Sequence, residues 1–253
     1  MTELLKRAAF RRTGKDREPK NRMREEGNRS DHDLTERLIT LLAPNDGASE
    51  AYRKVRTNLL YAFVDQSPKA IMLTSPGPGE GKSTTCANLG VVLAQAAKST
   101  LILDCDLRKP VIHKYFGLRN LRGIVDLLVG ECPLQEVWKE PVEGLKVVPA
   151  GPVPPNPAEI LGSQRFSKFL AAIREEFDYV LIDTSPVGPV SDPAILAPQA
   201  DGVLLVIDAQ NTRKGAGREA VHSLEAIGAN VLGAVMNNVR VTKGEGYYGY
   251  AYE

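Results

Sequence analysis

The sequence is poor in cysteine, in net charge and in long apolar runs. Its three cysteines are odd in number and show no metal-ligand spacing, which argues against a disulfide framework and favours a reducing cytosol. No apolar run approaches the roughly 18 residues that a membrane-spanning helix needs. Leu4-Leu5 is followed at once by Lys6-Arg7, which does not resemble a signal peptide. These features predict a cytoplasmic chain that does not enter a membrane unaided.

The charge is almost balanced, at +1 overall, so no global field favours nucleic acid or a membrane, and we expect no specific nucleic-acid partner. Basic residues gather in residues 1–30, with ten Lys or Arg against five Asp or Glu, a local net charge of +5. Few apolar residues occur there, so we expect residues 1–33 to be a disordered basic head. A solvated tail and a segment lying on anionic lipid or nucleic acid both fit this composition.

The remaining chain predicts one α/β domain over residues 34–239, because 253 residues with 43% hydrophobic content suffice for one sizeable core. Six apolar segments alternate with helical patterns, at residues 71–73, 100–103, 145–148, 179–182, 202–207 and 231–236. This alternation is typical of a mostly parallel sheet with helices on both faces. A long helix is expected over residues 158–176.

A glycine-rich loop lies between the first apolar run and a helical pattern. Nucleotide phosphates need backbone N–H groups, a cation and a hydroxyl for Mg²⁺, and the loop offers all three, with Lys82 as the cation and Ser83 as the hydroxyl. The pattern G-x-x-x-x-G-K-[ST] departs only at Pro76. A glycine-rich turn with a surface lysine is the alternative. The predicted nucleotide-binding residues of the loop are Gly77, Gly79, Glu80, Gly81, Lys82, Ser83 and Thr84.

Three aspartates follow apolar strands. Asp104 and Asp106 come after residues 100–103, and two acids at i and i+2 of an extended segment point the same way, so both reach a metal–phosphate centre. Asp183 ends the strand of residues 179–182, the position that holds Mg²⁺ in P-loop proteins. Ligands bind at this end of parallel strands. For the first pair, a strand-terminal turn with solvated acids is the alternative.

A helix is predicted from Ser49, which can cap it, onward. Glu50, Arg53 and Arg56 form a ladder of both charges on this helix, which from physics alone is an ordinary solvated face.

Half of the eight tyrosines occupy the last seven residues. Glycines between them predict a flexible, unpacked tail over residues 240–253. A low-complexity end without function and a tail that enters an active site both fit this pattern. The four tyrosines are Tyr247, Tyr248, Tyr250 and Tyr252.

Together these motifs resemble the bacterial tyrosine kinases, the P-loop protein-tyrosine kinases of capsule and exopolysaccharide systems, over residues 34–253. Six features match in the family's order: the E-x-x-R-x-x-R oligomerisation helix, two nucleotide motifs, the P-P-N-P loop, the third nucleotide motif and the tyrosine cluster. They fall on Glu50 to Arg56, Ser75 to Ser83, Leu101 to Arg108, Pro154 to Pro157, Val180 to Pro186, and Tyr247 to Tyr252. The resemblance assigns an oligomerisation role to Glu50, Arg53 and Arg56.

The resemblance implies a ring-shaped homo-oligomer in which the tyrosine tail of one subunit enters the active site of the next. Because it shows no membrane-spanning segment, the chain resembles the split form of the family. In that form the kinase is a separate chain, and a membrane adaptor of the polysaccharide co-polymerase type supplies an activating cytoplasmic tail. This implies a cytoplasmic protein at the inner face of the membrane that regulates polysaccharide synthesis or export. Protein substrates among sugar-nucleotide and polysaccharide enzymes are also implied.

The expected reaction transfers the γ-phosphoryl group of MgATP to a tyrosine hydroxyl, a step that depends on positioning and charge stabilisation. Lys82 holds the phosphates, while Ser83, Asp104 and Asp183 hold Mg²⁺ directly or through water. Asp106 is the candidate to orient or deprotonate the tyrosine, and the roles of Asp104 and Asp106 are interchangeable from sequence. Arg108 is expected to steady the loop or the charge at the nucleotide.

Three other functions remain open. A partitioning-type ATPase usually has a lysine where this loop has Gly77, and it lacks terminal tyrosines. A GTPase would carry N-K-x-D where this chain has Asn237-Asn238-Val239-Arg240. A scaffold of polysaccharide export whose ATP site only controls assembly is the third.

Overall fold

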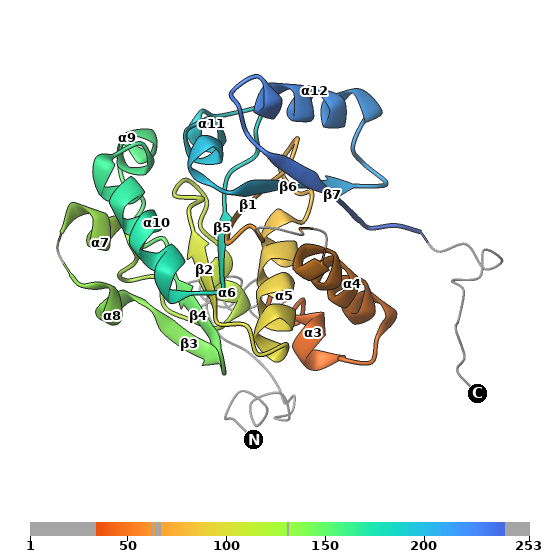
Figure 1. Ribbon diagram of the computed structural model, residues 1–253, viewed down its shortest axis with the longest axis horizontal. Coiled ribbons are helices and arrows are strands. Elements are labelled where there is room, and N and C mark those ends of the chain that lie inside the picture. The colour runs from red at the N-terminus through yellow and green to blue at the C-terminus, as the bar shows by residue number, and fades with distance from the viewer. Residues whose placement is uncertain (1–33, 62, 64–66, 131, 241–253) are drawn as a thin grey trace, which may run out of the picture.

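The computed structural model describes residues 34–240, apart from residues 62, 64–66 and 131 (Figure 1). Its first half contains α3 (Ile39–Leu42), α4 (Gly47–Tyr61), β1 (Ala70–Thr74), α5 (Lys82–Gln95), β2 (Thr100–Asp104), α6 (Ile112–Tyr115), α7 (Ile124–Val129) and α8 (Leu134–Val137). Its second half contains β3 (Lys139–Val142), β4 (Leu145–Val148), α9 (Pro157–Leu161), α10 (Gln164–Glu176), β5 (Tyr179–Asp183), α11 (Asp192–Leu196), η2 (Ala197–Gln199), β6 (Gly202–Asp208), α12 (Lys214–Glu225) and β7 (Val231–Asn237).

The strands form one seven-stranded sheet in the order β3-β4-β2-β5-β1-β6-β7. All neighbours are parallel except β3 and β4. Every residue of β1, β2 and β5 is buried, as expected of central parallel strands covered on both faces. The predicted mostly parallel sheet is confirmed, and all six predicted strands are present.

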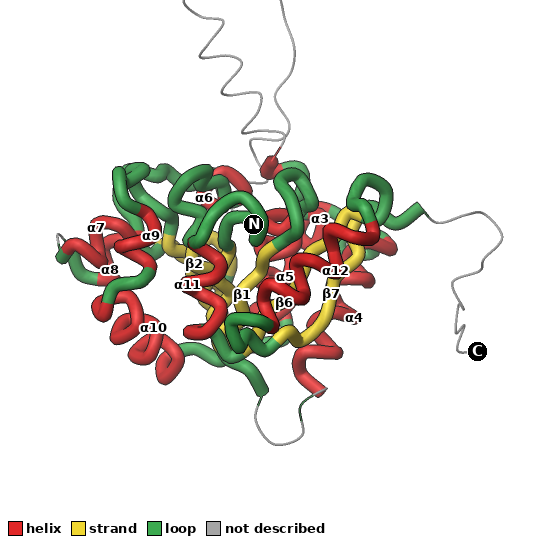
Figure 2. Tube along the Cα trace, turned by 90° about the horizontal axis from the view of Figure 1, so that it is seen from above, coloured by secondary structure: helices red, strands yellow, loops and turns green. Residues whose placement is uncertain are grey.

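Helices cover both faces of this sheet, each against its own apolar cluster (Figures 1 and 2). One cluster joins the sheet to α7, α9, α10, α11 and α12. The other joins it to α4, α5 and α6. Side chains of β2 alternate between the two clusters, with Leu101 and Leu103 in the first and Ile102 in the second. The sheet is therefore fixed from both sides.

The order of the three central strands brings the sequence motifs together. β1 pairs with β5, and β5 pairs with β2, so the chain ends that follow these strands emerge at one edge of the sheet. The glycine loop follows β1, and Asp104 and Asp183 are the last residues of β2 and β5. The register places Asp104 directly opposite Asp183. Parallel pairing of β1, β5 and β2 thus brings the glycine loop, Asp104 and Asp183 to one edge of the sheet, as the sequence predicted.

Three local expectations were wrong. The structure adds β3, a short antiparallel edge strand that includes Pro141, where an edge tolerates a missing N–H. The helix predicted over residues 158–176 is two helices, because it breaks at Gly162 and Ser163 caps α10 by accepting from Phe166 N. Ser49 does not cap α4: its buried hydroxyl donates to Ile39 O and Ala43 O instead.

No helix in the described part of the chain is both long and apolar enough to cross a bilayer. The predicted head, residues 1–33, lies outside the described residues, as do residues 241–253 of the predicted tail.

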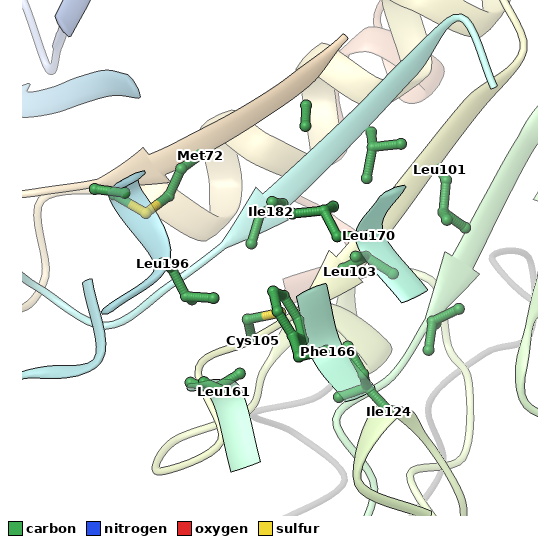
Figure 3. Close-up of a cluster of buried hydrophobic side chains, with 14 of the residues drawn as sticks. Met72, Leu101, Leu103, Cys105, Ile124, Leu161, Phe166, Leu170, Ile182 and Leu196 are labelled. Atoms are coloured by element: carbon green, nitrogen blue, oxygen red, sulfur yellow. The ribbon is translucent and has the colours of Figure 1, made fainter. Parts of the chain in front are cut away.

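Phe166 on α10 is fully buried among side chains of β2, β5 and α7 (Figure 3). Phe166→Ala would leave a cavity in this cluster, so we expect the free energy of unfolding to fall by about 3–5 kcal/mol. Urea unfolding followed by circular dichroism measures it. Lys168→Ala, at an exposed position of the same helix, should change it by less than about 0.5 kcal/mol. Equal losses in the two variants would contradict this account of the core.

Candidate active site

Lys82 lies at the centre of a cluster formed by the carboxyl ends of β1, β2 and β5. Its Nζ is 2.9 Å from Asp106 Oδ2 and 3.4 Å from both carboxylate oxygens of Asp183. The same Nζ donates to Ser83 Oγ at 3.1 Å, and Ser83 Oγ donates to Asp183 Oδ2 at 2.6 Å. The structure thus brings together four of the residues that the sequence assigned to the reaction.

Asp104 completes the cluster from the other side. Its Oδ2 accepts a hydrogen bond from Ile112 N at 3.0 Å. Its Oδ1 is buried and finds no hydrogen-bond partner among the described residues. A buried carboxylate oxygen without a partner is costly, and a cation is its natural ligand.

Burial and mutual charge shape the electrostatics of the two strand-terminal carboxyls. Burial, and then the charge of Asp183, raise the pKa of Asp104 well above its usual value. Burial also raises the pKa of Asp183, although Lys82 and the Ser83 hydroxyl act in the opposite direction. Burial alone would lower the pKa of Lys82, but the charges of Asp183 and Asp106 outweigh it, so the net shift is upward. Lys82 is therefore a permanent cation in this cluster.

These residues fit a magnesium ion shared with nucleotide phosphates. Mg²⁺ is usually held by one or two carboxylates, with the other ligands from phosphate and water. Asp104 and Asp183 supply such carboxylates, and Ser83 supplies the hydroxyl. Among the described residues, no group of three or more His, Cys, Asp or Glu is arranged to hold a metal ion by itself. The donor set therefore suits Mg²⁺ that arrives with a nucleotide, rather than a metal bound by protein alone.

Two glycines give the phosphate loop its path. Gly79 and Gly81 have φ of 82° and 91°, a region that side chains disfavour. A Cβ on Gly81 would also lie 2.0 Å from Asn237 Nδ2. Asn237 Nδ2 donates to Glu80 O at 3.1 Å, so the end of β7 supports the loop. Gly81 immediately precedes α5, whose N-terminus carries a partial positive charge suited to phosphate.

The side chain of Glu80 faces away from the lysine cluster. Its Oε2 accepts from Asp208 N at 2.6 Å and from the hydroxyl of Thr212. Glu80 thereby ties the phosphate loop to the loop between β6 and α12. A pocket of about 500 Å³ lies between these two loops, lined by Gly77, Gly79, Asp208, Asn211, Thr212 and Arg213 among others. Nucleotide binding by Glu80 itself stays a prediction.

Asp208 holds the far wall of this pocket. Hydrogen bonds from the side chains of Asn211 and Asn238 and from Gln210 N lower its pKa to about 2. Sequence reasoning missed this residue. Its position at the carboxyl end of β6 was the available signal, because ligands gather at that edge of the sheet.

Thr84 Oγ1 lies 2.7 Å from the hydroxyl of Tyr115, which is almost completely buried. The first turn of α5 is thus joined to α6. No sequence signal pointed to Tyr115, because it lies 31 residues from Thr84 in a short helix without a motif.

Arg108 binds Asp192 rather than the lysine cluster. Its Nε donates to Asp192 Oδ2 at 2.7 Å and its guanidinium donates again to Asp192 Oδ1 at 3.0 Å. Asp192 is fully buried, while 40% of the Arg108 side chain is exposed. This bidentate pair joins the segment after β2 to the start of α11. The predicted contact of Arg108 with nucleotide stays a prediction.

The charged ladder of α4 makes contacts inside its own subunit. Arg53 pairs with Glu50 at 3.0 Å and donates to Pro44 O at 2.7 Å. Arg56 donates to Val92 O of α5 at 3.1 Å. The oligomerisation role of these residues stays a prediction, and the four predicted acceptor tyrosines, Tyr247, Tyr248, Tyr250 and Tyr252, lie outside the described residues.

Comparison with known proteins adds independent findings. A family model described as an AAA domain matches residues 68–228. The chain is 40% identical over 215 residues to tyrosine-protein kinase YwqD of Bacillus subtilis, covering 84% of this chain and 91% of that protein. The crystal structure of the chimerical protein CapA2B2 matches with a TM-score of 0.79 at 36% identity, covering 81% of this chain and 91% of the other. The kinase domain of the Escherichia coli tyrosine kinase ETK matches with a TM-score of 0.78 at 29% identity, covering 99% of this chain and 91% of the other.

Asp104→Asn should stabilise the ligand-free chain at pH 7. Because the folded-state pKa of Asp104 is raised, ionisation disfavours the fold, and stability falls as pH rises from the unfolded value of about 3.9 through the folded value. We expect a higher free energy of unfolding at pH 7 in urea unfolding, with a weaker dependence on pH. Glu175→Gln at an exposed position is the control. A destabilised variant with an unchanged pH slope would refute the repulsion.

Arg108→Met should leave the Asp192 carboxylate buried without its partner, at a cost of about 1–3 kcal/mol in the free energy of unfolding. If Arg108 instead serves the nucleotide, the variant keeps its stability and its KM for ATP rises. Parallel urea unfolding and ATP titration separate the two roles. Lys109→Met, at the exposed neighbouring position, controls for lost charge.

Proposed function

The chain belongs to the bacterial tyrosine-protein kinases, and on that basis we propose that it transfers the γ-phosphoryl group of MgATP to tyrosines of its own carboxyl-terminal cluster. One observation carries the proposal: Lys82 Nζ lies within 3.4 Å of both Asp106 and Asp183, at the end of a phosphate loop. A phosphoryl group bound there would meet a cation on one side and carboxylates on the other. That arrangement suits a reaction governed by position and charge.

The phosphate loop and Lys82 bind the nucleotide phosphates. N–H groups around Gly79 and Gly81 line the approach, and Lys82 leaves its carboxylate partners to contact the β- and γ-oxygens. The pocket between this loop and the β6–α12 loop is the site for the remainder of the nucleotide, because it opens directly beside Gly77 and Gly79.

Asp104, Asp183 and Ser83 would hold Mg²⁺. The ion neutralises charge on the phosphates when it is bound. Asp104 Oδ1 is buried without a hydrogen-bond partner among the described residues, so it is the oxygen best suited to bind such a cation. After burial, the charge of Asp183 raises the pKa of Asp104, and the charge of Asp106 raises the pKa of Asp183. A bound cation would weaken both repulsions.

Asp106 is the residue that meets the acceptor tyrosine. Asp104 is fully buried and its Oδ2 is committed to Ile112 N, whereas Asp106 is 5% exposed and its Oδ2 pairs with Lys82. Once Lys82 moves to the phosphates, Asp106 Oδ2 is released to orient the tyrosine hydroxyl and accept its proton. This geometry favours Asp106 over Asp104 for the role that the sequence left open.

The acceptors are Tyr247, Tyr248, Tyr250 and Tyr252 of a neighbouring subunit in a ring built on Glu50, Arg53 and Arg56. Tethering keeps the tyrosines near the centre at high effective concentration. Each phosphate adds about −1.5 to −2 charges, so a fully modified tail would be repelled from the acidic centre and the ring would loosen. Sedimentation of the phosphorylated form as the unchanged oligomer would contradict this switch.

A membrane adaptor of the polysaccharide co-polymerase type is the proposed activator. It would place the kinase at the inner face of the membrane, where the chain regulates exopolysaccharide or capsule synthesis or export. Protein substrates would be enzymes of sugar-nucleotide and polysaccharide synthesis. Mass spectrometry of the tail with and without the adaptor's cytoplasmic segment tests the activation: unchanged tyrosine phosphorylation would exclude it.

Labelled ATP separates this reaction from the alternatives. Phosphotyrosine identifies the kinase, free phosphate alone identifies an ATPase switch, and neither product identifies a scaffold.

Lys82→Met should lower phosphotyrosine formation by about 10²-fold or more, the scale for losing a group that stabilises charge in a transition state. Initial rates with labelled ATP, followed by mapping of the tail tyrosines, measure this loss. Lys168→Met on the exposed side of α10 should keep the native rate. Retained ATP-dependent phosphotyrosine in Lys82→Met would overturn the assignment, provided that circular dichroism shows an intact fold.

A further inference from the structure

A hollow runs between α12 and the outer part of the sheet, at a distance from the lysine cluster. It has a volume of about 510 Å³, and its floor and walls include Leu205, Ile207, Gly217, Val221, Ala234 and Met236. We call it the α12–β7 groove. Figure 1 shows α12 lying over β6 and β7.

α12 presents small residues near its start, where the sequence is Lys-Gly-Ala-Gly. A Cβ on Gly217 would already be in van der Waals contact with Ile207, at 3.5 Å, so the helix lies close to the sheet at this turn. The side chains that line the groove come from both the helix and the sheet. Ala234 and Met236 alternate with the inward Val235 on edge strand β7, and 53% of Met236 is exposed. An apolar surface of the sheet is thus left open to solvent.

Basic side chains surround the end of the groove nearest the phosphate loop. Arg213, Lys214 and Arg218 line it and are exposed. The acidic residue that lines this end, Asp208, stays ionised and is hydrogen-bonded by Asn211 and Asn238, so three cations face one carboxylate. Glu225 lies at the opposite end of α12. The rim near the start of α12 is therefore positively charged, and an anionic occupant suits it.

The polypeptide leaves the described structure at this same end. Gln210 Nε2 donates to Asn238 O at 2.7 Å, and Arg240 Nε donates to Gln210 Oε1 at 2.8 Å. These bonds hold residues 238–240 against the loop that leads into α12. Arg240, the last residue that the structure describes, thus lies against the loop that leads into α12, and 13 further residues follow it in the sequence.

We propose that the α12–β7 groove is the docking site for residues 241–253 of the same chain. This segment carries four tyrosines for the apolar floor, while Glu245 and Glu253, against a single basic residue, Lys243, suit the basic rim. Seven residues beyond Arg240 reach up to about 23–25 Å, and α12 with its 12 residues is about 18 Å long, so Tyr247 reaches any point of the groove. The short tether gives an effective concentration in the millimolar range.

Docking and phosphorylation would then compete for the same segment, residues 241–253. A tyrosine that contacts Met236 in the groove cannot at the same time lie in the catalytic centre of a neighbouring subunit. This regulatory consequence rests on the proposed kinase function, but the docking itself does not.

Photo-crosslinking tests the docking without any catalysis. The full chain carries Lys82→Met, with p-benzoylphenylalanine in place of Tyr248, and adducts are mapped by mass spectrometry. Mixing with a ¹⁵N-labelled chain that lacks the probe separates adducts within one chain from adducts between chains. We expect adducts within one chain on α12 and β7. Adducts on the labelled partner's groove, on the phosphate loop, or spread over the surface would overturn the proposal.

Exposed substitutions test the two kinds of contact. Met236→Glu should lower the groove adducts about tenfold, because it places a charge on the apolar floor. Arg218→Glu should lower them about two- to fivefold, the scale of an exposed ion pair. The matched controls, Val153→Glu and Lys168→Glu, make the same charge changes at exposed positions elsewhere and should leave the yield unchanged. Equal yields in groove and control variants would also refute the docking.

Discussion

The pairing of β2 with β5 holds two buried carboxyls of like charge, Asp104 and Asp183, directly opposite each other. Such a contact is unfavourable in isolation: burial, and then the charge of Asp183, raise the pKa of Asp104, while burial and the charge of Asp106 raise the pKa of Asp183 against the opposing effect of Lys82. Lys82 offsets part of the repulsion through Asp183 and Asp106. An incoming cation, like protonation of Asp104, would relieve the repulsion that remains. The site is thus built for a ligand, and the rest of the fold tolerates it.

That tolerance comes from the two apolar clusters on either face of the sheet. β1, β2 and β5 are completely buried, so their register cannot relax to separate the charges. Bonds between loops extend the rigidity beyond the strands. Glu80 connects the phosphate loop to Asp208, and Asn237 fills the space beside Gly81. The phosphate loop is therefore held in direct contact with the loops that border α12.

Much of this arrangement followed from the sequence, because its signals are local. Apolar runs predicted the central strands, and the rule that ligands gather at the carboxyl ends of parallel strands brought Lys82, Asp104 and Asp183 together. Some failures are local, such as the helix break at Gly162 before the Ser163 cap, but most are long-range. Asp192, the partner of Arg108, lies 84 residues away, and Glu80 bonds to Thr212 across 132 residues. Ser49 has the composition of a cap, but packing of α3 gave its hydroxyl other acceptors. No periodicity encodes such contacts.

The hydrogen bonds of Arg53 and Arg56 bear on how subunits would associate. Arg53 already has Glu50 and Pro44 O, and Arg56 already has Val92 O. In an assembly built on α4, a neighbour's acceptors would either replace these intramolecular acceptors or use the remaining N–H donors of the two guanidinium groups. The net free energy of such an exchange is small and sensitive to ionic strength. Assembly on this helix would therefore be readily reversible, unlike one sealed by a large apolar interface.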